Sequence, residues 1–156
     1  MVTHDSGGPW DQLGTVYESV TPRGYLGWGH SSQLGFSLGL AMGAKLAAPE
    51  KLVVNFMGDG SIGMVGMDLE TAARAQIPIL TIVLNNGVFG NYERYMPIAA
   101  EKCDIKKVTG RYADLATSLG VQGERVERPQ EIGAALRRAG CTWPRGTTKT
   151  PHAGTA

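Results

Sequence analysis

The fold is decided by LVVNFMGDGSIGMVGMDLETAARAQIPILTIVLNNGV, the stretch from Leu52 to Val88. Residues 52–57 form a short apolar run that ends at a glycine turn, a pattern that indicates a β-strand buried on both faces. We expect a helix next, with Ser61 as its N-cap and Ala75 near its end. A second apolar run at residues 79–84 predicts a second buried strand.

The two turns that follow these strands are expected to lie side by side. A strand, a helix and a strand within so short a stretch form a right-handed parallel unit, which places both carboxyl ends at one edge of the sheet. Asp59 follows the first strand and Asn86 the second, so we expect the two side chains to meet.

This pair of turns has the chemistry of a magnesium site. The Asp59 carboxylate would repel a diphosphate at the helix N-terminus near Ser61 unless a cation lay between them. Magnesium takes oxygen ligands, commonly one or two from the protein and the rest from substrate phosphates and water. Asp59, the amide oxygen of Asn86 and a backbone carbonyl just beyond it could supply one side of that shell.

A second interpretation of the same turn is a dinucleotide site. Gly58, Gly60 and Gly63 spell G-x-G-x-x-G after a strand and before a helix. That fingerprint needs an acidic residue at the end of the next strand to bind the ribose, whereas this chain has Asn85 and Asn86 there. The pattern therefore favours a metal-bridged diphosphate, with a nucleotide-binding oxidoreductase as the alternative.

Two motifs carry a resemblance to a known family. GDG followed, after 24 intervening residues, by NN resembles the thiamine diphosphate motif of the acetolactate synthase and pyruvate decarboxylase superfamily. Upstream, GWGHSSQLGFSLGLAMGAKLA resembles the cofactor-facing helix entry of the acetolactate synthase branch. The likeness runs from about Val2 to Ala139. It implies an α/β fold with a doubly wound, mostly parallel sheet and helices on both faces.

The resemblance also implies site residues. The magnesium ligands would be Asp59, the side chain of Asn86 and the main-chain carbonyl of Val88. Leu34 matches the bulky apolar residue that props the cofactor in its bent form. The full set of implied cofactor contacts is Gly58, Asp59, Gly60, Ser61, Ser32, Leu34, Asn86 and Val88.

An activating residue is expected outside this chain. In the superfamily, a glutamate from a separate pyrimidine-binding domain, usually on a partner subunit, activates the aminopyrimidine ring. The resemblance places no such domain in these 156 residues, and Glu70 is on the wrong helix face to replace it. We therefore expect a 2-oxo acid carboligase or decarboxylase in the full-length homo-oligomer, but weak cofactor binding and no turnover from this chain alone. A non-catalytic fragment is the remaining alternative.

Composition excludes several other classes. A net charge of +1 gives no electrostatic case for binding nucleic acid or a membrane surface. Cys103 and Cys141 have neither metal-site spacing nor the density of a disulfide scaffold, so a reducing cytoplasm is the default. The sequence has no apolar run of the roughly 18 residues that a transmembrane helix needs.

The remaining patterns predict local structure. Residues 33–47 predict a helix whose glycines at positions 35, 39 and 43 share one stripe, interpreted as close packing on the sheet. We interpret His4 as a loop histidine, Asp5 as an N-cap, and three methionines as core residues. These are Met57, Met64 and Met67.

Further elements follow in order along the chain. We expect helices at 11–19, at 112–119 and from Pro129, with a short strand at 121–126. Residues 1–140 are predicted to be one thiamine diphosphate-binding domain, and residues 141–156 an irregular, disordered tail.

Overall fold

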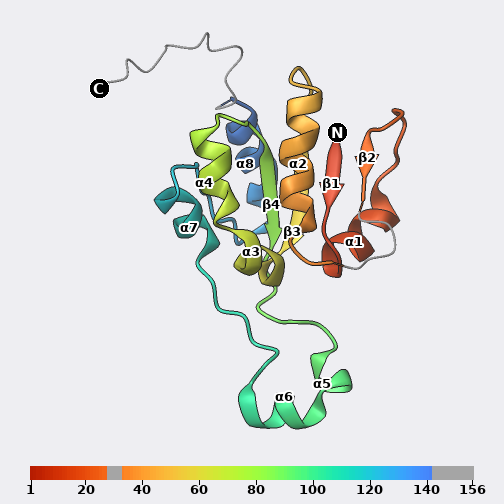
Figure 1. Cartoon of the computed structure of the whole chain (residues 1–156), viewed down its shortest axis with the longest axis vertical. Helices are drawn as coiled ribbons and strands as arrows, with labels where there is room; N and C mark the ends of the chain where they lie inside the picture. The colour runs from red at the N-terminus through yellow and green to blue at the C-terminus, as the bar shows by residue number, and fades with distance from the viewer. Residues whose placement is uncertain (28–32, 142–156) are drawn as a thin grey trace. The chain divides into compact units, whose positions relative to one another are not determined.

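The computed structural model describes residues 1–27 and 33–141 (Figure 1). The chain divides into two compact units, Met1–Gly123 and Glu124–Ala156, which are described separately. The tail predicted at 141–156 lies outside the described residues except for Cys141, which ends a described helix. The predicted contact at Ser32 also lies outside the described residues.

The first unit is built on a parallel sheet of four strands in the order β2-β1-β3-β4. The strands are β1 (Val2–His4), β2 (Tyr25–Leu26), β3 (Val54–Gly58) and β4 (Leu80–Leu84). All three neighbouring pairs are parallel, and Gly58 pairs with Leu84, so β3 and β4 end at the same level. The predicted α/β fold with a parallel sheet is confirmed.

Helices lie between these strands and follow the last of them. They are α1 (Gly8–Val16), α2 (Phe36–Ala47), α3 (Asp59–Val65), α4 (Asp68–Arg74), α5 (Tyr92–Tyr95), α6 (Pro97–Cys103) and α7 (Tyr112–Ser118). The chain moves from β1 outward to β2 and then back past β1 to β3. Because parallel connections are right-handed, that reversal places α1 and α2 on opposite faces, as a doubly wound sheet requires.

The core lies where α2, α3 and α4 meet β3. Leu38, Met57, Ile62 and Leu69 come from these four elements and are each at most 7% exposed. Burying a side chain of this size stabilises the fold by roughly 1.5–3 kcal/mol. Half-buried residues of α7, including Tyr112, pack against the same cluster. The sequence sets this contact by placing an apolar residue on the inner face of each element.

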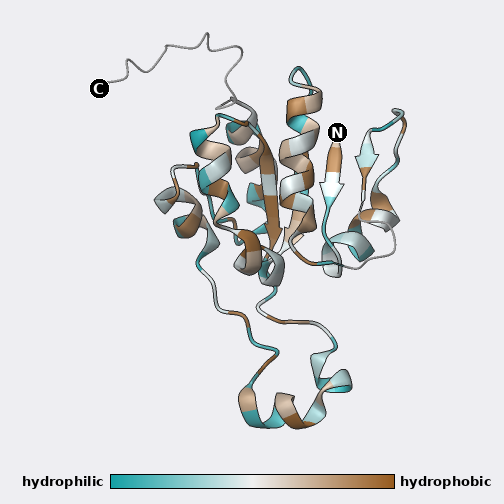
Figure 2. Cartoon of the chain, in the orientation of Figure 1, coloured by the Kyte–Doolittle hydropathy of each residue, from teal (hydrophilic) through white to brown (hydrophobic). Residues whose placement is uncertain are grey.

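Strand β3 is buried less completely than expected. Asn55 and Met57 are fully buried, but Val54 and Phe56 on the opposite face are only half-buried. The inner face includes a polar pair, because the Thr3 hydroxyl lies 3.0 Å from Asn55 Oδ1. Strand β4 is mostly hydrophobic (Figure 2), but its residues are half-buried and Leu84 is exposed, so it is not the fully buried strand that the sequence predicts. The burial predicted for both faces of β3 is therefore complete on one face only.

The single helix expected over residues 61–75 is two short helices. α3 begins at Asp59, two residues before the predicted N-cap, and its actual N-cap Gly58 makes no side-chain capping bond. Ser61 instead lies inside α3 and is buried. The helix breaks at Gly66 and Met67. Three glycines between residues 60 and 66 weaken the helix, since each glycine costs about 1 kcal/mol relative to alanine.

The break changes which methionines are buried. Met57 is fully buried in β3, as predicted. Met64 and Met67 are 58% and 67% exposed, so their assignment to the core is wrong. The 3.6-residue periodicity is not continuous across the break, so a pattern read through it assigned Met64 and Met67 to the wrong face.

The interpretation of the glycine stripe on α2 is also wrong. Gly39 and Gly43 are exposed, and a methyl group added at either would meet nothing within 4 Å. The buried face of α2 consists of larger side chains, including Leu38, Ala41 and Ala44, which leaves the two glycines on the outer face. Gly35 precedes the helix as its N-cap, with a left-handed φ of 86°.

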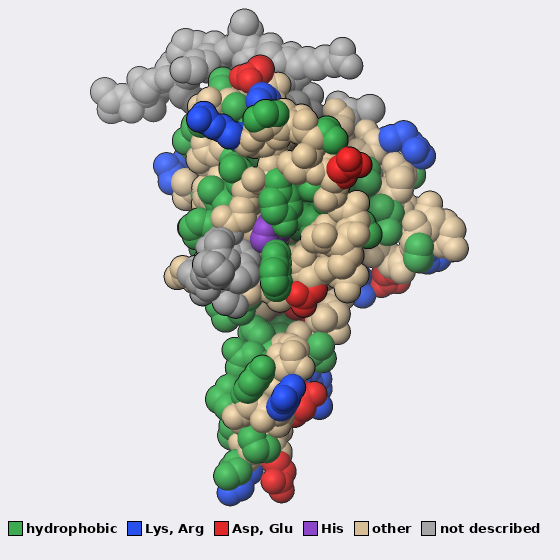
Figure 3. Space-filling view, turned by 90° about the vertical axis from the view of Figure 1, so that its right-hand side faces the viewer, with side chains coloured by type: hydrophobic (Ala, Val, Ile, Leu, Met, Phe, Trp, Pro, Cys, Tyr) green, Lys and Arg blue, Asp and Glu red, His purple; other side chains and the backbone are tan. Residues whose placement is uncertain are grey.

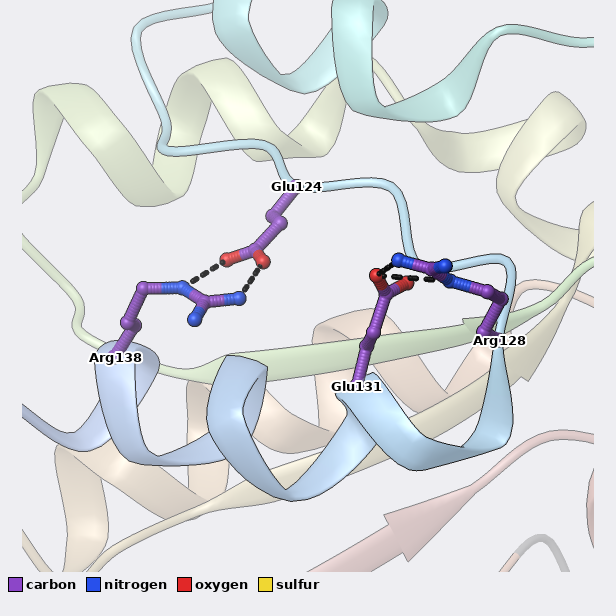
Figure 4. A network of polar contacts seen from close by, with 4 residues as sticks. All are labelled: Glu124, Arg128, Glu131 and Arg138. Carbon is purple, nitrogen blue, oxygen red and sulfur yellow. Dashed lines mark hydrogen bonds and ion pairs between the residues drawn. The ribbon is translucent and has the colours of Figure 1, made fainter.

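The second unit contains α8 (Pro129–Cys141), which begins at the proline as predicted. Two ion pairs brace it: Arg138 contacts Glu124, and Arg128 contacts Glu131 (Figure 4). The strand expected at 121–126 does not form. At Gly123 the backbone lies so close to the Ala113 carbonyl that no side chain would fit.

Apolar side chains remain on the surface of the first unit. The segment with α5 and α6, at the bottom of Figure 3, exposes hydrophobic side chains among charged ones. Tyr95 and Ile98 there are 73% and 68% exposed. None of the described helices combines the length and the hydropathy needed to cross a bilayer.

Candidate functional site

The carboxyl ends of β3 and β4 bring Asp59 against the turn that contains Asn86. Asp59 is 3% exposed. Its Oδ2 accepts a hydrogen bond from the N–H of Gly87 at 2.6 Å, and its Oδ1 accepts one from the N–H of Gly60 at 2.9 Å. The first turn thus holds the second through a buried carboxylate, and the two turns lie next to each other in space.

The second turn, which binds this carboxylate through the N–H of Gly87, also contains an amide oxygen and a backbone carbonyl. Asn86 is exposed, and its Oδ1 accepts the Val88 N–H at 3.1 Å. The Val88 carbonyl accepts no backbone hydrogen bond from the described residues. Two further bonds fasten the turn: the Phe89 N–H donates to the Lys106 carbonyl at 2.7 Å, and the Val108 N–H donates to the Gly87 carbonyl at 2.9 Å.

This donor set fits a hard cation completed by phosphate oxygens. Each carboxylate oxygen of Asp59 accepts one N–H and retains further lone-pair capacity. No basic side chain in the described ranges forms an ion pair with Asp59. The same ranges contain no cluster of three His, Cys, Asp or Glu residues suited to a metal. A single carboxylate with amide and carbonyl oxygens suits Mg²⁺, which keeps phosphate and water ligands.

The charge of Asp59 acts on Tyr112, a residue that the sequence did not indicate as part of the site. Burial raises the pKa of Tyr112, and the negative charge of Asp59 raises it further, while a backbone hydrogen bond at Gly110 lowers it. Tyr112 begins α7, which follows the excursion through α5 and α6. Only the folded chain brings this ring near the site, so no local pattern could have indicated it.

The aromatic ring of Phe89, in the second turn, packs against Gly60. A methyl group at Gly60 would lie 2.9 Å from Phe89 Cζ and closer still to Cε1, so the ring rests directly on the glycine. The Phe89 ring also packs on Tyr92, with centroids 5.3 Å apart. The two turns are therefore joined by a hydrogen bond at Gly87 and by ring packing at Gly60.

The other predicted cofactor contacts lie at the start of α3 and just before α2. Gly58 is the last residue of β3, and Gly60 and Ser61 are buried in the first turn of α3. Leu34 is half-buried just before α2. Gly63, the third glycine of the dinucleotide pattern, is exposed with open space around it. It therefore does not make the close helix–strand packing for which that fingerprint needs a glycine.

The end of β1 differs from its prediction. His4 is not a loop residue: it ends β1, is 2% exposed and stacks on Tyr25 with ring centroids 4.9 Å apart. Asp5 is not an N-cap, because α1 starts at Gly8 with Gly7 as a cap that makes no side-chain bond. Asp5 is fully buried, and its Oδ2 accepts the N–H of Gly35 at 2.8 Å.

Comparison with known proteins identifies the fold and the family. Residues 8–148 match the family model described as thiamine pyrophosphate enzyme, C-terminal TPP binding domain. A thiamine diphosphate-dependent 4-hydroxybenzoylformate decarboxylase of Rhodococcus jostii RHA1 has a similar structure, with a TM-score of 0.77 and 28% sequence identity. That similarity covers 91% of this chain and 27% of the decarboxylase.

Curated relatives agree. A probable acetolactate synthase of Mycobacterium bovis is 32% identical over 142 residues, which is 89% of this chain and 26% of that protein. A probable acetolactate synthase large subunit of Methanococcus aeolicus is 30% identical over the same length and is covered to 24%. This chain thus spans about a quarter of these relatives. It belongs to the thiamine pyrophosphate enzyme family and corresponds to the C-terminal TPP-binding domain of acetolactate synthase-like members.

Proposed function

We propose that this chain binds thiamine diphosphate through Mg²⁺, as the diphosphate-binding domain of an acetolactate synthase-like 2-oxo acid carboligase or decarboxylase. The observation that carries the proposal is the buried Asp59 carboxylate, bonded to Gly87 in the turn that contains Asn86 and Val88. The family membership supports thiamine diphosphate as the cofactor.

Each turn has a distinct role in this proposal. Asp59, the Asn86 amide oxygen and the Val88 carbonyl would hold the metal, which would bind the diphosphate. Gly58, Gly60 and Ser61 would bring backbone close to the phosphate oxygens where β3 passes into α3. Leu34 would support the cofactor between its two rings, and Ser32 would contact the aminopyrimidine. When bound, thiamine diphosphate supplies the carbanion and electron-sink chemistry at its thiazolium ring.

The proposed reaction needs a further domain. Within the described residues, Glu70 lies on α4, half-exposed, and pairs with Arg74 at 2.9 Å. The activating glutamate would come from a pyrimidine-binding domain, elsewhere in the protein or on a partner subunit of a homo-oligomer. The substrate would be a 2-oxo acid, and the compartment the cytoplasm.

Calorimetric titration of the chain with thiamine diphosphate, with and without Mg²⁺, tests this function. We expect binding only with the metal, and we expect Asp59→Ala to weaken it by roughly 100-fold or more, because the variant lacks a direct ligand. Asp68→Ala is the matched control, since Asp68 is an exposed carboxylate at the start of α4 in the same unit. It should leave the affinity unchanged.

Other outcomes identify the alternatives. Binding of NAD that is indifferent to Mg²⁺ would support a dinucleotide site. Absence of binding to either cofactor would leave a non-catalytic fragment. Metal-dependent affinity that is the same in the Asp59→Ala variant would refute the proposed ligand set even if thiamine diphosphate binds.

A further inference from the structure

We propose that Asp5 is a positioning residue that fixes Leu34, and through it the part of the cofactor beyond the diphosphate. This inference rests on the proposed function. It concerns a carboxylate at the end of β1, the strand that neighbours β3 in the sheet. The Asp5 carboxylate would not touch the cofactor.

The main chain of Asp5 is fastened to the strand that leads to the metal site. Its N–H donates to the carbonyl of Phe56 in β3 at 2.8 Å. Its side chain is fully buried, with Oδ1 accepting the N–H of Ser6 at 3.3 Å. The carboxylate is therefore held in a fixed orientation relative to β3, and its second oxygen is directed at the loop before α2.

That second oxygen binds the residue that follows Leu34. Oδ2 accepts the N–H of Gly35 at 2.8 Å, across 30 residues of chain. Gly35 has a φ of 86°, and a methyl group there would lie 2.5 Å from Cγ1 of Val65. Gly35 is thus held between Asp5 and α3, and the backbone that carries Leu34 is fixed on its C-terminal side.

Asp5 and Asp59, two buried carboxylates at the ends of neighbouring strands, each bind a backbone N–H of a glycine in a loop distant in sequence. Asp59 binds the N–H of Gly87, between Asn86 and Val88. Asp5 binds the N–H of Gly35, next to Leu34. No basic side chain of the described residues forms an ion pair with either acid. Burying a carboxylate without such a partner is costly. Its compensation here comes from backbone N–H groups, which must stay in place.

The test compares two ligands that share the metal and the diphosphate. Mg²⁺ with inorganic pyrophosphate needs only the Asp59 site, whereas Mg²⁺ with thiamine diphosphate also uses Leu34. We expect the unaltered chain to prefer thiamine diphosphate. Asp5→Asn should reduce that preference by roughly tenfold, because its amide cannot accept both N–H groups. Leu34→Ala should reduce it similarly, and the double variant should lose little more.

A matched control separates positioning from general destabilisation. Lys45 is a buried charge at the opposite end of α2, where Nζ donates to the carbonyls of Pro49 and Lys51 at 2.8 and 2.7 Å. Lys45→Met should lower stability and leave the preference for thiamine diphosphate unchanged. If Asp5→Asn fails to fold, Asp5→Ser replaces it, because the smaller hydroxyl puts no amide donor against the Gly35 N–H.

The outcomes are distinguishable. A preference for thiamine diphosphate that survives Asp5→Asn or Leu34→Ala overturns the inference and leaves the proposed function standing. Absence of metal-dependent binding by the unaltered chain overturns both. A measurement that needs no variant is amide hydrogen exchange at Gly35, which should be slow in the unaltered chain. Rapid exchange there also overturns the inference.

Discussion

At the scale of single residues, Gly60 is required by packing and not by backbone conformation. Its φ is not in the left-handed region, but the Phe89 ring occupies the space of its missing side chain. This contact joins residues on the two turns of the candidate site, 29 positions apart in the chain. The glycine turn is therefore shaped by its aromatic neighbour as well as by any phosphate.

We predict that Gly60→Ala destabilises the chain by about 1–3 kcal/mol, the usual cost of overpacking a tight contact. Phe89→Ala should remove most of that penalty when the two changes are combined. Urea unfolding of the two single variants and the double variant measures the coupling. Gly63→Ala is the control, because Gly63 lies in the same helix with open space around it. Additive effects of Gly60→Ala and Phe89→Ala would contradict the packing argument.

A second prediction concerns Glu124, whose pKa is lowered chiefly by its hydrogen bond from Arg138. We expect Arg138→Gln to return the pKa of Glu124 toward its ordinary value. A carboxyl with a depressed pKa stabilises the fold above its unfolded pKa, and that contribution is lost as the pH falls through the folded pKa. Carboxyl NMR titration measures it, with Arg137→Gln as the control. An unchanged titration of Glu124 in Arg138→Gln would show that the pair does not form in solution.

The meeting of Asp59 with the 86–88 turn could be predicted from the sequence, because local rules determine it. A short strand-helix-strand unit has one handedness, so Asp59 and the 86–88 turn must share an edge. The bond between Asp5 and Gly35 could not be predicted in this way. It depends on β1 lying between β2 and β3, an order that short-range periodicity does not specify.

At the scale of elements, the sequence indicated helices and strands better than it indicated their faces. The strands β3 and β4 and the helices α2, α7 and α8 lie close to their predicted ranges. The glycines of α2 were assigned to the wrong face because small residues suit either close packing or solvent. What decides is the competition with the larger side chains of the same helix, which bury more apolar area.

The outward orientation of these glycines leads to an element-scale prediction. Gly39→Ala and Gly43→Ala should each stabilise the chain by about 0.5–1 kcal/mol, because alanine lowers the conformational entropy of the unfolded chain and meets no neighbour in the helix. Thermal and urea unfolding measure the gain. Gly35→Ala should do the opposite, since that glycine has a positive φ and contacts Val65. Destabilisation by Gly39→Ala would mean that another surface covers α2 in solution.

At the scale of the whole molecule, the chain corresponds to one domain of much longer relatives. It spans about a quarter of its curated relatives, and every metal and diphosphate contact proposed here lies in the first unit. These contacts bind and orient a cofactor, but none of them is a free acid or base next to an aminopyrimidine ring. We therefore expect this chain to bind the cofactor without catalysing turnover, whereas a complete enzyme does both.

The corresponding prediction is that the chain saturated with Mg²⁺ and thiamine diphosphate consumes pyruvate no faster than buffer with the same cofactors. The physical reason is that ring activation needs a glutamate, which we place on another domain. Pyruvate depletion followed spectrophotometrically measures this, with a full-length acetolactate synthase as the positive control. Turnover that disappears in Asp59→Ala would show that the chain supplies its own activating group, and the search for that group would then begin at Tyr112, the titratable ring influenced by the Asp59 charge.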